Sequence, residues 1–240
     1  MPTPVPVIFD LDGTLVDPAG GITGGIAAAL RQLGMPVPGP ADLDAMVGPK
    51  LSHSLLEIAG VPADRLEDVI RLYRAHYLAE GIARSRVYDG IRELLETFAA
   101  DGRPAAVATQ KPEHLARIVL DHHGLTGLFH TIRGSAADES ASAHGPAGKA
   151  GIVAAALADL GTGYAVMVGD RAQDVAGAAA NGLECIGVGW GFALDGELAG
   201  AGAVAVVHST SDLTDTITRL DAVRTGALQA LNEVHTDGNV

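Results

Sequence analysis

Two aspartates stand close together directly after an apolar segment near the start of the chain. The segment Val5–Phe9 is followed by Asp10-Leu11-Asp12-Gly13-Thr14. Alternate residues of an extended chain point the same way, so the carboxylates of Asp10 and Asp12 are expected to lie near each other. Close carboxylates repel, and Mg²⁺, which prefers oxygen ligands, relieves that repulsion. Gly13 allows a sharp turn whose N–H groups suit an anion. A surface turn rich in Asp and Gly is the plain alternative.

This pentapeptide resembles the first motif of the haloacid dehalogenase-like phosphohydrolase superfamily, Asp-x-Asp-Gly-Thr after the first strand. The other three motifs of that family follow in order. Thr109 matches a Ser or Thr at a strand end, Lys149 matches a lysine near a helix start, and Lys111 is the alternative lysine. Asp170 and Asp174, in Gly169-Asp170-Arg171-Ala172-Gln173-Asp174, match the fourth motif.

Each later match has an ordinary structural explanation when it is taken alone. Thr109 and Asp170 could be helix caps, Lys149 a solvated lysine, and Asp174 an acid in a first helical turn. The ordered set covers roughly Val5 to Leu220, and on it the chain is identified as a member of the superfamily.

The resemblance implies a role for each matched residue. Asp10 would attack phosphorus and form an aspartyl-phosphate. Asp12 would protonate the leaving oxygen and then deprotonate the water that releases phosphate. Thr109, Gln110 and Lys149 would bind the phosphate, as phosphoryl transfer rests mainly on positioning and electrostatics. The residues expected to hold the cofactor Mg²⁺ are Asp10, Asp12 through its backbone carbonyl, Asp170 and Asp174.

The acid at position 12 narrows the expected activity. Dehalogenases and phosphonate hydrolases of this fold lack an acid there, so Asp12 favours phosphate-ester chemistry. The first hypothesis is a Mg²⁺-dependent phosphatase acting on a small phosphorylated metabolite, either phosphoglycolate-like or a nucleoside monophosphate. A β-phosphoglucomutase-like phosphosugar mutase keeps the same acid pair and would require a bisphosphate activator. A non-catalytic, phosphate-binding regulatory module is the third hypothesis.

Composition excludes several other classes of protein. With 29 acidic and 16 basic side chains, the formal charge of −13 disfavours nucleic acid or an anionic membrane as a partner. Apolar residues make up 48% of the chain and charged residues 19%, which argues against disorder. No segment approaches the roughly 20 apolar residues of a membrane-spanning helix, and the N-terminus lacks the basic region of a signal peptide. We therefore expect a soluble cytoplasmic protein.

Short apolar runs alternate with helical patterns along most of the chain. The runs rich in β-branched residues predict parallel strands buried on both faces. Strand and helix alternation predicts a doubly wound α/β sheet. The expected strands are Val5–Phe9, Ala105–Ala108, Tyr164–Val168, Cys185–Val188 and Ala203–Val207. The expected helices lie around residues 91–98, 115–122 and 152–160.

One stretch contains helical patterns only, and it predicts an insertion after the first strand. We expect an α/β core over residues 1–16 and 85–225, a small α-helical cap over 17–84, and a C-terminal tail over 226–240. The cap resembles that of the branch similar to phosphoglycolate phosphatase and 5'-nucleotidase-like members. Within it, Lys50 is the expected contact to the substrate anion, with a solvated loop lysine as the alternative. Residues 136–148 read as a flexible loop.

Overall fold

A parallel β-sheet forms the centre of the fold in the computed structural model, which describes residues 4–136 and 148–237. Within these residues, six strands lie in the order β5-β4-β1-β6-β7-β8, and each neighbouring pair is parallel. The strands are β1 (Val7–Phe9), β4 (Ala105–Pro112), β5 (Thr131–Ser135), β6 (Val166–Gly169), β7 (Cys185–Val188) and β8 (Ala205–Val207). The expected doubly wound α/β fold is confirmed. The loop predicted over residues 136–148 falls almost wholly outside the described residues.

The central strand β1 brings three strand ends together. Its Phe9 pairs with Val107 of β4 on one side and with Val168 of β6 on the other. All three β1 residues are fully buried, because the sheet is covered on both faces. The chain places β4 and β5 on one side of β1 and β6 to β8 on the other. In such sheets, ligands bind beyond the carboxyl ends of the strands, where the strand order reverses.

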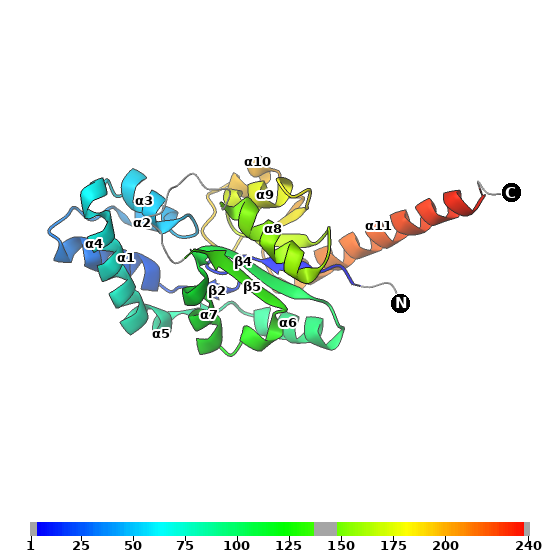
Figure 1. The fold of residues 1–240 in the computed structure, drawn as a ribbon, viewed down its shortest axis with the longest axis horizontal. Helices are drawn as coiled ribbons and strands as arrows, with labels where there is room; N and C mark the ends of the chain where they lie inside the picture. Colours follow the sequence, from blue (N-terminus) through cyan, green and yellow to red (C-terminus); the bar gives the residue numbers. More distant parts are fainter. Residues whose placement is uncertain (1–3, 137–147, 238–240) are drawn as a thin grey trace.

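Helices cover both faces of the sheet, as Figure 1 shows. Helices α6 (Ile91–Ala100) and α7 (Glu113–His122) lie on one face, and α8 (Lys149–Leu160), α9 (Ala172–Ala179) and α10 (Glu197–Ala201) lie on the other. The last helix, α11 (Thr210–Asp237), begins beside β8 and extends away from the body of the molecule.

A two-stranded antiparallel sheet marks the point where the chain leaves the central sheet and returns to it. It pairs β2 (Val16–Asp17) with β3 (Arg86–Val87). The helices between these strands form a separate group at one end of the molecule (Figure 1). They are α1 (Gly21–Gln32), α2 (Pro40–Ala45), α3 (Leu51–Glu57), α4 (Leu66–His76) and α5 (Ile82–Arg84), with the 3₁₀-helix η1 (Ala63–Arg65) and the π-helix η2 (Tyr77–Gly81). We call this group the cap.

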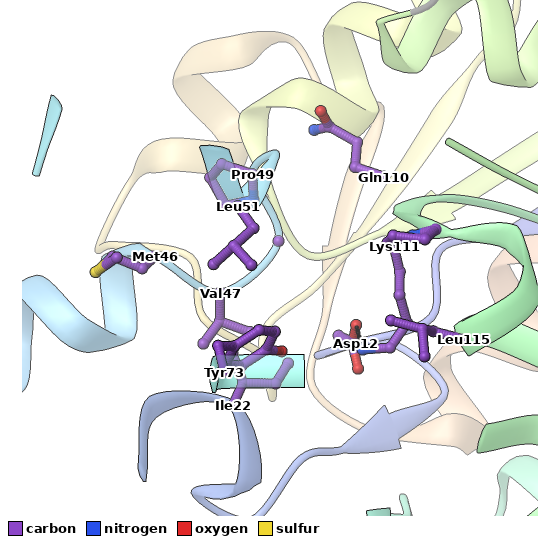
Figure 2. A pocket seen from close by; sticks show the side chains of 12 residues that line it. Asp12, Ile22, Met46, Val47, Pro49, Leu51, Tyr73, Gln110, Lys111 and Leu115 are labelled. Atoms are coloured by element: carbon purple, nitrogen blue, oxygen red, sulfur yellow. Dashed lines mark hydrogen bonds and ion pairs between the residues drawn. The ribbon is translucent and has the colours of Figure 1, made fainter. Parts of the chain in front are cut away.

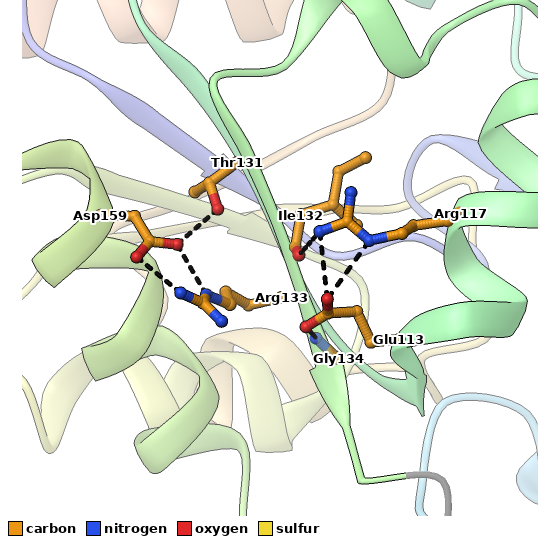
Figure 3. Close-up of polar contacts among 7 residues, drawn as sticks. All are labelled: Glu113, Arg117, Thr131, Ile132, Arg133, Gly134 and Asp159. Atoms are coloured by element: carbon orange, nitrogen blue, oxygen red, sulfur yellow. Dashed lines mark hydrogen bonds and ion pairs between the residues drawn. The ribbon is translucent and has the colours of Figure 1, made fainter.

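Strand β5 is an edge strand that the hydrophobic pattern did not predict. Polar side chains tie it to the helices on both faces, as Figure 3 shows. Arg133 forms an ion pair with Asp159 of α8 at 2.6 Å, and Arg117 of α7 donates to the backbone carbonyl of Ile132 at 2.9 Å. With one buried apolar side chain, Ile132, the strand lacks the apolar run by which the other strands were found.

The expected strand bounds hold to within a few residues. Three strands begin two residues later than their apolar runs, at Val7, Val166 and Ala205. Strand β4 continues past Ala108 to Pro112, and its register against β5 shifts between these residues. Such a bulge re-aims side chains, and bulges are frequent next to active sites.

Candidate active site

Three buried carboxylates meet where β1 and β6 end. Asp10 follows β1, Asp170 follows β6, and Asp174 lies in the first turn of α9. One oxygen of each lies within 4.8 Å of the others. A set of carboxylate oxygens at this spacing fits a hard divalent cation such as Mg²⁺. The carboxylate of Asp12 lies outside the cluster, and the metal contact expected from its backbone carbonyl stays a prediction.

Glycines and hydrogen bonds fix the carboxylate of Asp170. A Cβ atom at Gly13 (φ +88°) would lie 2.2 Å from Asp170 Oδ2, and one at Gly191 would lie 2.4 Å from the same oxygen. These distances leave no room for a side chain. Asp170 also accepts hydrogen bonds from Thr14 Oγ1 at 3.2 Å and from Phe192 N at 2.8 Å. Burial raises the pKa of Asp170 well above its ordinary value, and the charges of Asp174 and Asp10 add to the shift.

Lys149, at the start of α8, supplies a positive charge to the cluster. Its Nζ contacts Asp10 Oδ1 and lies 2.6 Å from Asp174 Oδ1. Burial opposes the charge of this lysine, but the two carboxylates outweigh that effect and raise its pKa. Burial raises the pKa of Asp10 from 3.8 to about 7, although Lys149 lowers it. Lys149 thus pairs with two of the three carboxylates of the cluster, and the excess negative charge favours a bound cation.

A second ion pair holds the carboxylate of Asp12. Lys111 Nζ lies 2.7 Å from Asp12 Oδ2, and both side chains are buried. The same ammonium lies 4.5 Å from the centre of the Tyr77 ring, a cation–π contact that reaches the core lysine from the cap. Asp12 Oδ1 is buried and lacks a hydrogen-bond partner in the described part of the chain. The two lysines that the sequence offered as alternatives therefore serve two different aspartates.

The structure places the predicted phosphate-binding residues in different surroundings. Thr109 lies in the bulged part of β4, is buried, and accepts a hydrogen bond from the backbone N–H of Lys111 at 3.2 Å. A hydroxyl that accepts in this way keeps its own proton to donate. The side chain of Gln110 points away from Asp12 (Figure 2), so its contribution to phosphate binding rests on its backbone N–H. The phosphate contacts of Thr109, Gln110 and Lys149 stay predictions.

A small pocket of about 40 Å³ lies between the cap and the core beside Asp12, as Figure 2 shows. The core side contributes Asp12, Gln110, Lys111, Pro112 and Leu115, and the cap side contributes Ile22, Met46, Val47, Gly48, Pro49, Leu51 and Tyr73. Lys50 stands between two lining residues but does not line the pocket itself. Its expected contact with the substrate anion stays a prediction.

Arg171 connects the core to the cap at this pocket. Its Nη1 donates to the backbone carbonyl of Val47 at 2.7 Å, and its Nε lies 3.1 Å from Glu197 Oε1. Gly48 (φ +99°) faces the same side chain, because a Cβ there would lie 2.9 Å from Arg171 Cγ. The cap loop therefore packs directly on the loop that carries Asp170.

Sequence reasoning missed several residues of the site. Thr14 stands inside the first motif, so its place in the loop was a signal that it could reach the cluster. For Arg171 the sequence leaves two possibilities, a pair with an acid near the site or a place on the helix surface, but nothing in it indicates the contact with Val47, 124 positions away. Tyr73 and Tyr77 belong to the cap, and their helical spacing indicated only a buried face.

The family follows from comparison with known proteins. The family model described as "Haloacid dehalogenase-like hydrolase" matches residues 7–188. The chain therefore belongs to the haloacid dehalogenase-like hydrolases. This confirms the expected family. No helix of the described residues is long and apolar enough to cross a membrane.

Relatives of this chain carry the names of different phosphate-handling enzymes. "Tyrosine-protein kinase PtkA" of Mycobacterium tuberculosis is 42% identical over 79% of this chain, which spans only 64% of that protein. A "5'-nucleotidase" of Pseudomonas aeruginosa is 37% identical over 80% of this chain and 86% of its own. A "Phosphoglycolate phosphatase" of Caulobacter vibrioides is 32% identical over 86% of this chain and 88% of its own. Among solved structures, a "predicted phosphatase" from Clostridium acetobutylicum superposes with a TM-score of 0.82 at 35% identity, covering 90% of this chain and 99% of that one.

Proposed function

We propose that this protein is a Mg²⁺-dependent phosphatase that hydrolyses a small phosphate monoester through an aspartyl-phosphate on Asp10. The observation that carries the proposal is the cluster of Asp10, Asp170 and Asp174 with Lys149 against it. The names of the relatives support phosphoglycolate-like esters and nucleoside monophosphates as the substrates to test first. A cytoplasmic location stays a prediction from the sequence.

Asp10 is proposed as the nucleophile because of its position and its partners. It follows the central strand, and its backbone N–H donates to the carbonyl of Val168 at 2.9 Å, which fixes its direction. Lys149 contacts Oδ1 and favours the ionised form, which is the form that attacks phosphorus. The metal, held by Asp10, Asp170 and Asp174, would neutralise the charge on the phosphate oxygens.

Asp12 is proposed as the acid and base. Lys111 holds Oδ2, which leaves Oδ1 to donate a proton to the leaving oxygen and later to accept one from water. The pocket beside Asp12 is where the leaving group would lie. Thr109 would donate its hydroxyl proton to a phosphate oxygen, since its oxygen already accepts from Lys111 N.

The test is phosphate release from a panel of esters, in Mg²⁺ and in chelator. The panel contains phosphoglycolate, nucleoside monophosphates, hexose phosphates and phosphotyrosine, the last because one relative is named a tyrosine-protein kinase. We expect metal-dependent release that Asp10→Asn abolishes and that the control Asp101→Asn, at an exposed position after α6, retains.

Two other outcomes would each favour a different function. Turnover of hexose phosphates that requires a bisphosphate activator would favour a phosphosugar mutase. Binding of Mg²⁺ and inorganic phosphate by the folded protein, without turnover of any ester, would favour a regulatory module.

A further inference from the structure

The pocket beside Asp12 is built mainly from apolar side chains of the cap and the core. Ile22, Val47 and Leu51 line it from the cap, and Leu115 faces them from the core (Figure 2). Binding pockets of this kind are commonly apolar with a few placed polar groups that fix orientation. The lining side chains that carry polar atoms are Asp12, Tyr73, Gln110 and Lys111. Among them Asp12 has a buried Oδ1 without a hydrogen-bond partner in the described chain.

The charges around the pocket oppose a second anion in the substrate. Among the described lining residues, the only cation is Lys111, and it already pairs with Asp12 at 2.7 Å and packs on the ring of Tyr77. A carboxylate on the leaving group would meet the Asp12 carboxylate and a mainly apolar wall, whose other polar side chains, Gln110 and Tyr73, carry no positive charge. A buried charge without a partner is strongly unfavourable.

The size of the pocket limits the leaving group as well. Its volume is about 40 Å³, and a single water needs roughly 10–15 Å³ on the same measure. With the cap in this position, the enclosed part of the pocket accepts a group of a few heavy atoms. The contact of Arg171 with the carbonyl of Val47 holds the cap loop in that position.

We infer that the substrate is a phosphate monoester with a compact, uncharged and apolar leaving group. This inference rests on the proposed function, because it places the leaving group beside the proposed acid. It separates the candidate substrates, since phosphoglycolate carries a carboxylate and nucleoside monophosphates carry a bulky base and sugar. The pocket favours neither of them.

Two esters of nearly the same shape test the inference. In isobutyl phosphate, a neutral isopropyl group stands where phosphoglycolate has its carboxylate, and both esters release an alcohol from a CH₂–O–P linkage. We expect kcat/KM of the wild-type enzyme in Mg²⁺ to be at least about tenfold higher for isobutyl phosphate, a ratio that one mismatched group in a pocket can produce.

A positive charge placed in the pocket should weaken or abolish the preference for the neutral ester. Leu51 is half-buried, so Leu51→Lys can add an ammonium at the pocket wall without burying it fully. We expect this variant to lower the ratio of the two kcat/KM values by about tenfold or more. Leu78→Lys is the matched control, because Leu78 is 51% exposed and does not line the pocket. Its ratio should equal that of the wild type.

The outcomes separate the inference from the proposed function. Equal or faster turnover of phosphoglycolate by the wild type would overturn the inference and leave the phosphatase function intact. An unchanged ratio in a folded Leu51→Lys would also overturn it, since the leaving group would then lie elsewhere. Absence of turnover for both esters and for the whole panel would remove the proposed function, and the inference with it.

Discussion

Replacing Asp10 by Asn should stabilise the metal-free protein at alkaline pH, although it removes the proposed nucleophile. Asp10 is buried, and its pKa lies at about 7 instead of 3.8, chiefly because of burial. Because the folded value is the higher one, the folded state retains a proton that the unfolded state has lost. The stability that depends on this proton is fully present below pH of about 4 and is lost as the pH rises through 7.

The magnitude follows from the two pKa values. At about 1.4 kcal/mol per pKa unit, the raised pKa of Asp10 costs the folded state roughly 4 kcal/mol at pH 8, where the carboxyl is ionised. At pH 5 the cost is roughly 2 kcal/mol, because the folded state keeps a proton that the unfolded state has lost. The neutral Asn resembles protonated Asp in shape and avoids this cost. Lys149 is not left alone in the variant, since Asp174 lies 2.6 Å away. In chelator, Asp10→Asn should therefore be more stable than the wild type, and more so at pH 8 than at pH 5.

The assay is urea unfolding at the two pH values, in chelator and then in Mg²⁺. Metal at a hundredfold excess over its Kd adds about 2.7 kcal/mol to a protein that binds it at one site. The wild type should gain this stability and the variant, with one ligand fewer, should gain less. Asp101→Asn should behave as the wild type throughout. An Asp10→Asn protein that is equally or less stable than the wild type at pH 8 in chelator would refute the reasoning.

Three further substitutions probe the surroundings of the cluster. Lys149→Met leaves buried carboxylates without their cation and should cost about 3–5 kcal/mol in urea unfolding in chelator, with phosphate release lost. Gly13→Ala forces a Cβ to 2.2 Å from Asp170 Oδ2 and should weaken Mg²⁺ binding, measured by calorimetry, by about tenfold or more. Gly48→Ala places a Cβ 2.9 Å from the arginine that contacts the cap loop, and should raise KM more than it lowers kcat.

Gly102→Ala is the control for the two glycine substitutions. Gly102 has a φ of +67° and open space around its Cβ position, so Gly102→Ala carries the backbone strain without the clash. Gly13→Ala or Gly48→Ala with the same Mg²⁺ affinity and KM as Gly102→Ala would contradict the packing argument. A Lys149→Met protein with full stability in chelator would contradict the charge balance proposed for the cluster.

The order of motifs along the chain predicted which carboxylates come together. Asp10 and Asp170 each follow an apolar run, and parallel strands place such residues on one edge of a sheet. These strands could be predicted because they are buried on both faces, which makes their sequences continuously apolar. The same reading was unsuccessful for β5, because an edge strand needs fewer apolar side chains and draws on ion pairs such as Arg133–Asp159.

The remaining features depend on contacts between distant parts of the chain. Nothing near Lys111 in sequence indicates that it pairs with Asp12, 99 positions away, under the ring of Tyr77. The bulge in β4 that accompanies this arrangement follows from its pairing with β5. The pocket is lined by cap residues and by core residues that precede and follow the cap in the sequence. Its apolar character therefore appears only when the cap lies on the core.

The central claim, that Asp10 becomes phosphorylated, is tested most directly by trapping the phosphate on it. Acetyl phosphate is a compact mixed anhydride whose leaving group, acetate, needs little help from an acid, so Asp12→Asn should still be phosphorylated in Mg²⁺. The variant lacks the proposed base for the attacking water, so the phosphorylated form should accumulate. After an acid quench, mass spectrometry should find one phosphoryl group on the peptide that contains Asp10, and none in the Asp10→Asn control. The account would be contradicted if the wild type released phosphate but no phosphoryl group were found on Asp10 in either the wild type or Asp12→Asn.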